Sequence, residues 1–137
     1  MNTTIIADSS GIISLISKSD NNHHRAAAIS EELERTKGSV IIPSDVFSET
    51  INIVGKKLGH NIATEVVNKI QSVKTFLIVD SDEKIRSRAM EKFKNQPSSV
   101  SFTDCMVMSV ADSFNTKQIF GFDEVFRKNG YKRLGLD

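Results

Sequence analysis

The stretch TTIIADSSGIISLIS, residues 3–17, decides the fold. Residues 3–7 are apolar or β-branched, which predicts a short buried strand. Residues 11–17 are again mostly apolar and predict a short helix, with Asp8 at the junction. A strand that leads at once into a helix is the beginning of a βα unit. The acid at the junction is therefore expected at the carboxyl end of a buried strand.

The rest of the chain repeats this alternation of strand and helix. Strands are predicted at residues 39–42, 76–79 and 118–122, with a short one near residues 131–134. Helices are predicted at residues 22–37, 43–58, 62–73, 82–93 and 102–111. The helix that Pro43 opens has its main apolar stripe at Phe47, Ile51, Val54 and Leu58. Strands separated by helices predict an α/β fold: three layers, α/β/α, with a parallel central sheet of four to five strands, in one domain over residues 1–137.

Composition narrows the class of protein. The chain has 137 residues, 39% hydrophobic and 26% charged, as in an ordinary globular domain. Its net charge of +1 gives no overall basic field, although a local basic rim is compatible with it. Cys105 is the only cysteine, so we expect no internal disulfide and a cytoplasmic location. The sequence contains neither a signal peptide pattern nor an apolar run long enough to cross a membrane.

A second informative stretch is SFTDCMVMSVA, residues 101–111. Ser101 and Asp104 have the spacing of a capping box, in which the acid stabilises the start of a helix. Asp104 also shares a helical face with apolar residues, and a charge on an apolar face requires a partner. The stretch alone leaves both interpretations open, and other acids placed in the same way are needed to choose between them.

Four acids are expected to meet at one edge of the sheet. Asp8 directly follows the first strand, and Asp123 directly follows the strand predicted at residues 118–122. Glu49 lies in the second turn of the helix after the second strand, and Asp104 opens the helix that leads to the fourth. Ligands of open α/β sheets bind beyond the carboxyl ends of the strands. We name these four residues the acid rim and treat it as a candidate site.

Four carboxylates so close together require compensation. Each pair of like charges about 5 Å apart costs about 3 kcal/mol at an effective dielectric constant near 20. Retained protons would relieve part of this cost. A hard divalent cation such as Mg²⁺ or Mn²⁺, which prefers oxygen ligands, would relieve more of it. No cluster of histidine and cysteine competes for a softer metal.

The sequence resembles a known family at this point. The segments IIADSSGIISL, IIPSDVFSETINIV, SFTDCMVMSVA and IFGFDEVFRKNGY are similar to the four signature blocks of the PIN domain, in the same order. Each block carries one acid of the acid rim, and together they cover essentially the whole chain. In length and pattern the chain most resembles the VapC-type toxins of type II toxin–antitoxin pairs.

The resemblance implies a metal-dependent endoribonuclease that hydrolyses RNA phosphodiester bonds with Mg²⁺ or Mn²⁺. It implies that Asp8, Glu49, Asp104 and Asp123 are both catalytic residues and metal ligands, with Asp8 and Asp104 as the main ones. It also implies that Ser10 orders the site and that the strands preceding Asp8 and Asp123 are neighbours. One residue departs from the family: Gly121 stands where many relatives carry Thr or Ser.

The resemblance further implies partners. A cognate antitoxin would lay a segment over the first helices near Ile12, Ile13 and Ile16, and an arginine of that segment would replace the charge of a metal. A homodimer is expected, because the two helices after Pro43 carry many apolar residues, among them Val46, Ile53, Ile62, Val66 and Ile70. Candidate RNA contacts, for which ordinary surface charge is an equal explanation, are Lys56, Lys57, Arg127, Lys128, Lys132 and Arg133.

Alternatives from other classes remain open. The chain would also fit a PIN nuclease of RNA processing that is no toxin, or a PIN fold that binds RNA without cleaving it. An acidic-pocket signalling domain of the receiver type would need two adjacent acids after the first strand, where this chain has Asp8, Ser9 and Ser10. A haloacid-dehalogenase-type phosphatase would need a second acid at Ser10. The sequence decides neither which RNA is cut nor whether one or two metals bind.

Overall fold

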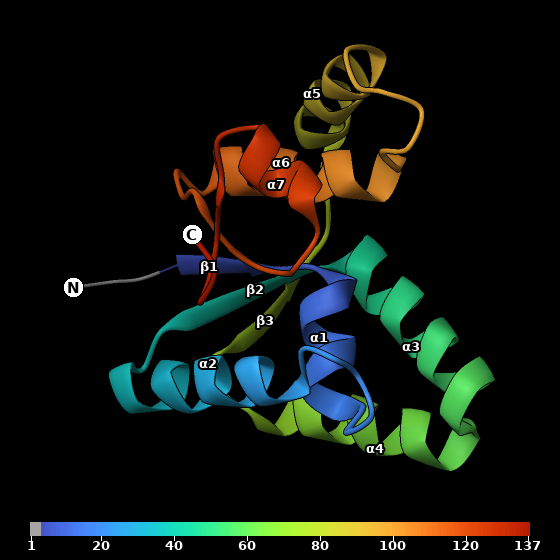
Figure 1. The fold of residues 1–137 in the computed structure, drawn as a ribbon. Helices are drawn as coiled ribbons and strands as arrows, with labels where there is room; N and C mark the ends of the chain where they lie inside the picture. Colours follow the sequence, from blue (N-terminus) through green and yellow to red (C-terminus); the bar gives the residue numbers. More distant parts are fainter. Residues whose placement is uncertain (1–3) are drawn as a thin grey trace.

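The structure, a computed structural model, describes residues 4–137 and contains a five-stranded parallel sheet with helices on both faces (Figure 1). The strands are β1 (Thr4–Ala7), β2 (Ser39–Pro43), β3 (Phe76–Val79), β4 (Gln118–Phe120) and β5 (Lys132–Arg133). Their order across the sheet is β3-β2-β1-β4-β5. The predicted three-layer fold with β1 beside β4 is confirmed, with Ala7 paired to Phe120. Thr3, predicted in the first strand, lies outside the described residues.

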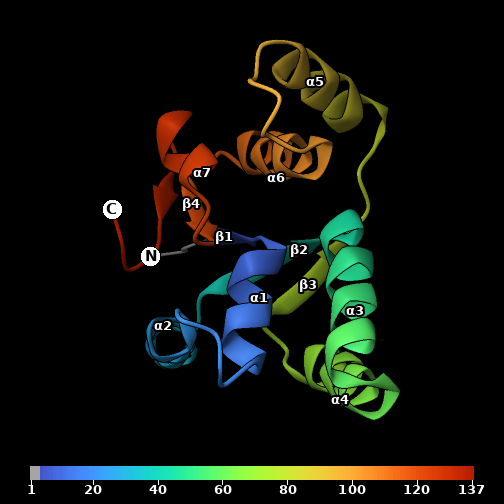
Figure 2. The ribbon, with the colours of Figure 1, turned by 45° about the vertical axis from the view of Figure 1, so that its right-hand side comes forward.

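Seven helices cover the sheet among residues 4–137. They are α1 (Ser9–Ile16), α2 (His23–Thr36), α3 (Ser44–Leu58), α4 (His60–Ser72), α5 (Glu83–Lys94), α6 (Phe102–Ser113) and α7 (Glu124–Lys128). Helices α1, α2 and α4 lie on one side of the sheet, and α6 and α7 lie on the other with α5 stacked on α6 (Figures 1 and 2). Helix α3 contacts β2, β3 and α6. None of the helices described is long and apolar enough to cross a membrane.

Helix α6 is the centre of the core. Residues 105–111 of this helix are all buried, because the sheet lies below them and α5 lies above. The apolar stretch that the sequence predicts as a core helix is confirmed. Cys105 is among these buried residues and forms no disulfide. The position of Asp104, one residue before this buried run, is therefore fixed by the packing of the whole helix.

Helix α1 is pressed against β4 because Gly11 has no side chain. A Cβ atom at Gly11 would lie 2.2 Å from the carbonyl oxygen of Phe120, which no real side chain tolerates. The backbone N–H of Asp8 also donates to that carbonyl oxygen at 3.0 Å. These two contacts hold the first turn of α1 against the neighbouring strand.

The fourth strand is shorter than predicted. It ends at Phe120, and not at residue 122, because the N–H of Phe122 donates to the Ser10 hydroxyl at 3.0 Å and not to a neighbouring strand. Asp123 therefore does not directly follow the strand. It caps α7, a short helix that the sequence analysis did not predict.

The buried face of α3 also differs from the prediction. Its buried residues are Val46, Thr50 and Val54, whereas Leu58 of the predicted stripe is 45% exposed. Pro43 ends β2, paired with Val79, and the helix begins at Ser44. Helix α3 has apolar residues on two sides, because it packs against α4 on one side and against α1 and α6 on another. Spacing alone did not reveal which side is more deeply buried.

Candidate active site

The four acids of the acid rim lie near enough to one another for their charges to interact. Each lies at the start of a helix: Asp8 caps α1, Asp123 caps α7, Asp104 is in the first turn of α6, and Glu49 is in the second turn of α3. After burial, the negative charges of Asp104 and Glu49 raise the pKa of Asp8. The charges of Asp123 and Glu49 likewise add to the effect of burial on the pKa of Asp104. The predicted acids therefore lie near enough for their charges to act on Asp8 and Asp104.

Asp8 is the most deeply buried of the four, with 4% of its surface exposed. Burial is the largest cause that raises its pKa from 3.8 to about 6, and hydrogen bonds from Ser10 oppose this rise. The Ser10 hydroxyl donates to Asp8 Oδ2 at 2.6 Å, and the Ser10 backbone N–H donates to the same oxygen at 3.2 Å. Near neutral pH the site therefore holds a buried carboxylate whose charge is poorly stabilised by its surroundings.

Ser10 connects two distant parts of the chain. Its hydroxyl donates to Asp8 and also accepts the backbone N–H of Phe122 at 3.0 Å, across 112 residues of sequence. One side chain thus fixes the orientation of Asp8 and the path of the backbone just before Asp123. The sequence singled out Ser10, but the contact with Phe122 could not be read from it.

Ser9 was missed by the sequence analysis. Its hydroxyl donates to Glu49 Oε1 at 2.7 Å, which ties the acid of α3 to the first turn of α1. The pair of hydroxyl residues directly after Asp8 is the signal that could have suggested it. On a helix, neighbouring positions point in different directions, so each serine is able to serve a different acid.

The structure shows how Asp104 fits both interpretations of its sequence, as a helix cap and as an acid of the candidate site. The predicted capping box is confirmed: Ser101 Oγ accepts the Asp104 N–H at 3.0 Å, and Asp104 Oδ2 accepts the Ser101 N–H at 3.1 Å. Burial is nevertheless the first cause that raises the pKa of Asp104. One oxygen serves the cap while the carboxylate still contributes to the field of the other acids, so the two interpretations are compatible.

Asp123 is the exposed member of the acid rim. Its Oδ1 accepts the N–H of Val125 at 3.2 Å, as expected of a helix cap. Two residues before it, Gly121 packs directly against Asp8, and a Cβ atom at Gly121 would lie 2.8 Å from Asp8 Cβ. A Thr or Ser at this position, as in many relatives, does not fit unless Asp8 moves. The departure from the family pattern thus has a packing reason.

The side chains of the acid rim offer only carboxylate oxygens, the type of ligand that a hard divalent cation prefers. As the side chains are placed, however, no three acids, histidines or cysteines within residues 4–137 are close enough together to hold one ion. Each acid is instead held by a local donor, namely Ser10, Ser9, Ser101 or Val125. Convergence on one ion requires some of these side chains to rotate, Glu49 away from Ser9 among them.

The basic residues proposed as RNA contacts are only partly available. Arg133 is 9% exposed; it binds both oxygens of Asp137 and donates to the carbonyl oxygen of Phe122 at 3.1 Å, so its candidacy is wrong. Arg127 donates to both oxygens of Glu124. Among the described residues, the candidates that are exposed and form no ion pair are Lys56, Lys57 and Lys132.

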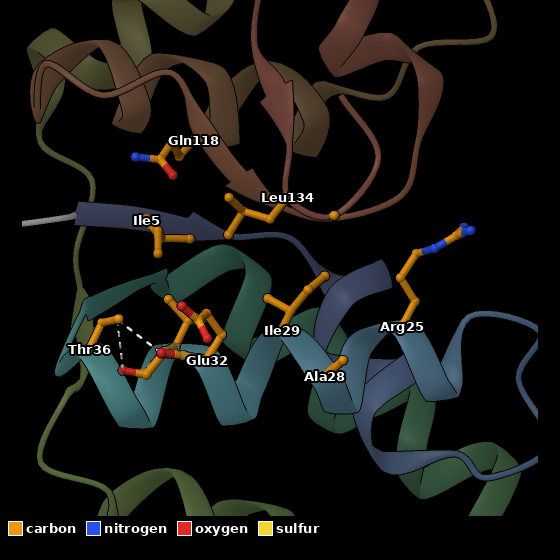
Figure 3. A pocket seen from close by; sticks show the side chains of 10 residues that line it. Ile5, Arg25, Ala28, Ile29, Glu32, Thr36, Gln118 and Leu134 are labelled. Atoms are coloured by element: carbon orange, nitrogen blue, oxygen red, sulfur yellow. Dashed lines mark hydrogen bonds between the residues drawn. The ribbon is translucent and has the colours of Figure 1, made fainter.

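A large hollow of about 530 Å³ lies elsewhere, between α2 and the sheet (Figure 3). Figure 3 shows Ile5, Gln118 and Leu134 facing the side chains of α2 across it. Its only acid is Glu32, and the remaining lining residues are Arg25, Ala28, Ile29, Leu33, Thr36 and Gly135. This hollow therefore lacks a cluster of acids and is distinct from the candidate site.

Comparison with known proteins defines the family of this protein. The family model of the PIN domain matches residues 5–131, and the chain belongs to the PIN domain family. No curated protein matches the chain in sequence.

Solved structures similar to this chain include two proteins of the VapC and VapBC type. One is VapC20 of Mycobacterium tuberculosis, described as a sarcin-ricin loop cleaving toxin, with a TM-score of 0.80 and 19% identity over 95% of this chain and 98% of that one. The other is VapBC2 from Rickettsia felis, bound to a DNA fragment from their promoter, with a TM-score of 0.61 and 17% identity over 82% and 83% of the two chains. At these identities the likeness shows the fold.

Proposed function

We propose that this protein is a metal-dependent endoribonuclease that hydrolyses RNA phosphodiester bonds, and that it is the toxin of a toxin–antitoxin pair. The observation that carries the proposal is the acid rim. Four acids from four distant segments share one field, and the innermost, Asp8, is buried with a pKa of about 6. Membership of the PIN family supports this proposal, as does the likeness to VapC20, a sarcin-ricin loop cleaving toxin.

Asp8 and Asp104 are the proposed main ligands of Mg²⁺ or Mn²⁺, with Glu49 and Asp123 holding a second ion or orienting the attacking water. When bound, the cation supplies Lewis acidity to the phosphate and a more acidic water. The protein's own part is to hold the acids in position. Ser10 fixes Asp8, and Ser9 fixes Glu49 until the carboxylate rotates toward the ion.

Removal and return of the metal test this proposal. Protein treated with a chelator and dialysed is expected to leave a mixed-sequence RNA intact, and addition of Mg²⁺ or Mn²⁺ is expected to restore cleavage. Ca²⁺ and ionic-strength-matched NaCl serve as controls for non-specific salt effects. Cleavage that persists at full rate after chelation would contradict a metal-dependent mechanism. RNA binding without cleavage under every metal condition would favour the non-catalytic alternative.

An antitoxin is the proposed protein partner. An apolar groove of about 210 Å³ runs between α1 and α4 beside β3, and its lining includes Ile12, Ile16 and Phe76. A segment of the antitoxin seated there would lie on α1, which Asp8 caps and Ser9 begins. An arginine of that segment would reach Asp8, Glu49 or Asp104 and bind carboxylate through two hydrogen bonds.

Competition between arginine and metal tests the antitoxin proposal. Each basic residue of the antitoxin is changed to Ala in turn, and inhibition of cleavage is measured at rising Mg²⁺. One variant is expected to inhibit less well, and Mg²⁺ is expected to compete with the parent antitoxin. Equal inhibition by all variants, with no effect of Mg²⁺, would mean that the antitoxin only blocks access of the RNA.

A homodimer is also proposed, but through another surface than the one predicted from the sequence. Of the apolar residues singled out on α3 and α4, Val46, Val66 and Ile70 are buried within the core and unavailable. The edge strand β3 instead exposes Leu77 and Ile78, by 48% and 45%. Uncovered apolar edge strands tend to pair with another chain.

The direction of the backbone groups limits how two copies pair. The N–H of Val40 in β2 donates to the carbonyl oxygen of Thr75 at 2.8 Å, so the backbone of Thr75 faces β2. By the alternation along a strand, Leu77 also faces β2, while the backbone of Ile78 faces outward. The N–H of Phe76 already donates to the carbonyl oxygen of Val73 at 3.1 Å. An antiparallel pair centred on Leu77 therefore places Phe76 opposite Ile78, with the N–H of each Ile78 donating to the carbonyl oxygen of Phe76 in the other copy.

The same register brings the two copies of Leu77 together. The two Leu77 residues then form a non-hydrogen-bonded pair, with Cα atoms about 4.5 Å apart.

Cross-linking tests this register. The Leu77→Cys variant is expected to form a dimer linked by a disulfide under mild oxidation, because that separation suits a disulfide. The Ile78→Cys variant, with similar exposure in the parent chain, is the control, since the two residues 78 would lie too far apart to be bridged. Cys105 is buried and does not interfere. Equal cross-linking of both variants, or of neither, would contradict the register.

A further inference from the structure

Two exposed phenylalanines lie together next to the acid rim. Phe93 is near the end of α5, and Phe102 is the first residue of α6. Their rings meet edge to face, with centroids 5.7 Å apart and an angle of 71° between the planes. They are nevertheless 45% and 37% exposed, so the chain itself does not cover them. Phe102 precedes Asp104 by two residues in the first turn of α6, so their backbones are about 6 Å apart, while their side chains leave the helix on different sides.

The surrounding charge points to a particular ligand. Helix α5 carries five basic residues and two acidic ones, whereas α6 beneath it carries two acids and no base. On α5, Lys92 is paired with Asp112 and Lys94 with Glu91. Arg86 is exposed and has no ion pair among residues 4–137.

These features share one side of α5. Arg86, Met90 and Phe93 stand at positions i, i+4 and i+7, which lie on one face of a helix. All three are exposed. The ring of Phe93 contacts the ring of Phe102 at the connected ends of α5 and α6, which together form a helical hairpin. We name these four residues the hairpin face. It combines a free guanidinium, an apolar surface and two aromatic rings, spread over about 10 Å of helix.

We propose that the hairpin face binds single-stranded RNA beside the acid rim, with an unpaired base stacked on Phe93 and Phe102 and a phosphate at Arg86. This inference rests on the proposed ribonuclease function and names a binding subsite for its substrate. Unpaired bases stack on aromatic rings, whereas bases inside a duplex are not accessible to them. A ligand with stacking bases and regularly spaced negative charges fits this mixture of groups better than a purely apolar protein segment.

Binding without cleavage tests the proposal. Fluorescence anisotropy of a labelled 12-nucleotide single-stranded RNA is measured in a chelating buffer, with a duplex of the same sequence as a second probe. Phe93→Ala and Phe102→Ala are each expected to raise the Kd for the single strand about 5- to 100-fold, the range for loss of one stacked base. The weaker binding of the duplex is expected to change little. Arg86→Ala is expected to reduce the salt dependence by about one phosphate contact.

The chain provides a matched control. Phe114 is 38% exposed and lies just after α6, at the end opposite Phe102. Phe114→Ala is expected to bind RNA like the parent, and Phe93→Trp to retain binding, while thermal melts check that every variant is folded.

Three results would overturn the proposal. The first is that Phe93→Ala and Phe102→Ala bind the single strand as well as Phe114→Ala does. The second is that single strand and duplex are weakened equally. The third is that these variants change only the oligomeric mass in light scattering, which would make the hairpin face a protein interface. Because no metal is present, loss of RNA binding here is distinguishable from failure of the metal-dependent cleavage test.

Discussion

Helix α6 carries one acid near each end, and their surroundings are opposite. At the far end, Asp112 is partly buried, yet hydrogen bonds from Lys92 at 2.8 Å and Tyr131 at 2.7 Å outweigh burial and lower its pKa. At the near end, burial raises the pKa of Asp104, and its charged neighbours are Asp123 and Glu49. The same helix therefore shows one acid matched by a cation and one surrounded by acids.

The two ends of α6 show the difference between an acid that stabilises the fold and an acid of a candidate site. Asp112, which is half-buried, is paired with a cation and so contributes to stability. The acid rim lacks such pairing, and Asp8, its most buried member, has serine as its side-chain partner. Strongly perturbed acids gathered in one place are typical of functional sites. The following predictions test this comparison, beginning with the largest expected effect.

The largest effect is expected on catalysis. Asp8→Asn and Asp104→Asn should each lower metal-dependent RNA cleavage by more than about 10³-fold, since they remove ligand charge without changing shape, a loss beyond that of a single stabilising donor. Asp112→Asn, on the same helix, should keep the parental kcat/KM. Single-turnover cleavage with excess protein measures all three. Full activity of either rim variant would refute the assignment of the acid rim.

A large effect is also expected on stability and its dependence on pH. The folded-state pKa of Asp8, about 6, lies above its unfolded value of 3.8, so between these values the folded state binds more protons. Metal-free protein should therefore lose about 2 kcal/mol of unfolding free energy as the pH rises from 4.5 to 7. Asp8→Asn should remove most of this loss.

Urea denaturation at the two pH values, in a chelating buffer, measures this effect. Asp112→Asn is the control, because the pKa of Asp112 is lowered and its titration falls below this window. An identical pH dependence in Asp8→Asn and the parent would show that Asp8 is not the group that titrates.

A smaller effect is expected from the serines that hold the acids. Ser10→Ala should reduce cleavage about 10- to 100-fold, as loss of outer partners of metal ligands commonly does. Ser9→Ala should reduce it less, because Glu49 must leave Ser9 to approach an ion. Cleavage at saturating and limiting Mg²⁺ measures both variants. If the effect of Ser9→Ala exceeds that of Ser10→Ala, their assigned importance is reversed.

The smallest effect is expected at the far end of α6. Lys92→Met should lower the unfolding free energy by about 1 kcal/mol, because both partners of its ion pair with Asp112 are 28% exposed and partly screened. Cleavage of RNA should not change. Thermal melts and the cleavage assay together check this, and a loss of activity without loss of stability would link this end of the helix to the site.

Local patterns predicted the elements well. The strand at Phe76–Val79 has the predicted bounds, and the capping box of Asp104 was visible in four residues of sequence. The acid rim followed from the rule that strand ends face one edge, without knowledge of any contact. These features depend on residues close in sequence or on the topology of parallel sheets.

Features that depend on distant contacts were not predicted. The early end of β4 requires that Ser10 accept the N–H of Phe122, and the position of Glu49 requires Ser9, 40 residues away. Arg133 looked like a surface charge because its partner, Asp137, lies on the same short turn and covers it only in the folded chain. The hairpin face was not predicted either, because it depends on the contact between Phe93 of α5 and Phe102 of α6.

The sheet order also sets a time at which the site forms. Strand β4 lies beside β1, and the contact between Phe122 and Ser10 joins residues 112 apart. At about 5–20 residues per second, the ribosome takes on the order of ten seconds to add them. Until β4 emerges, Asp8 lacks the wall that buries it and Asp123 does not yet exist. A growing chain therefore carries no complete acid rim during most of the protein's synthesis.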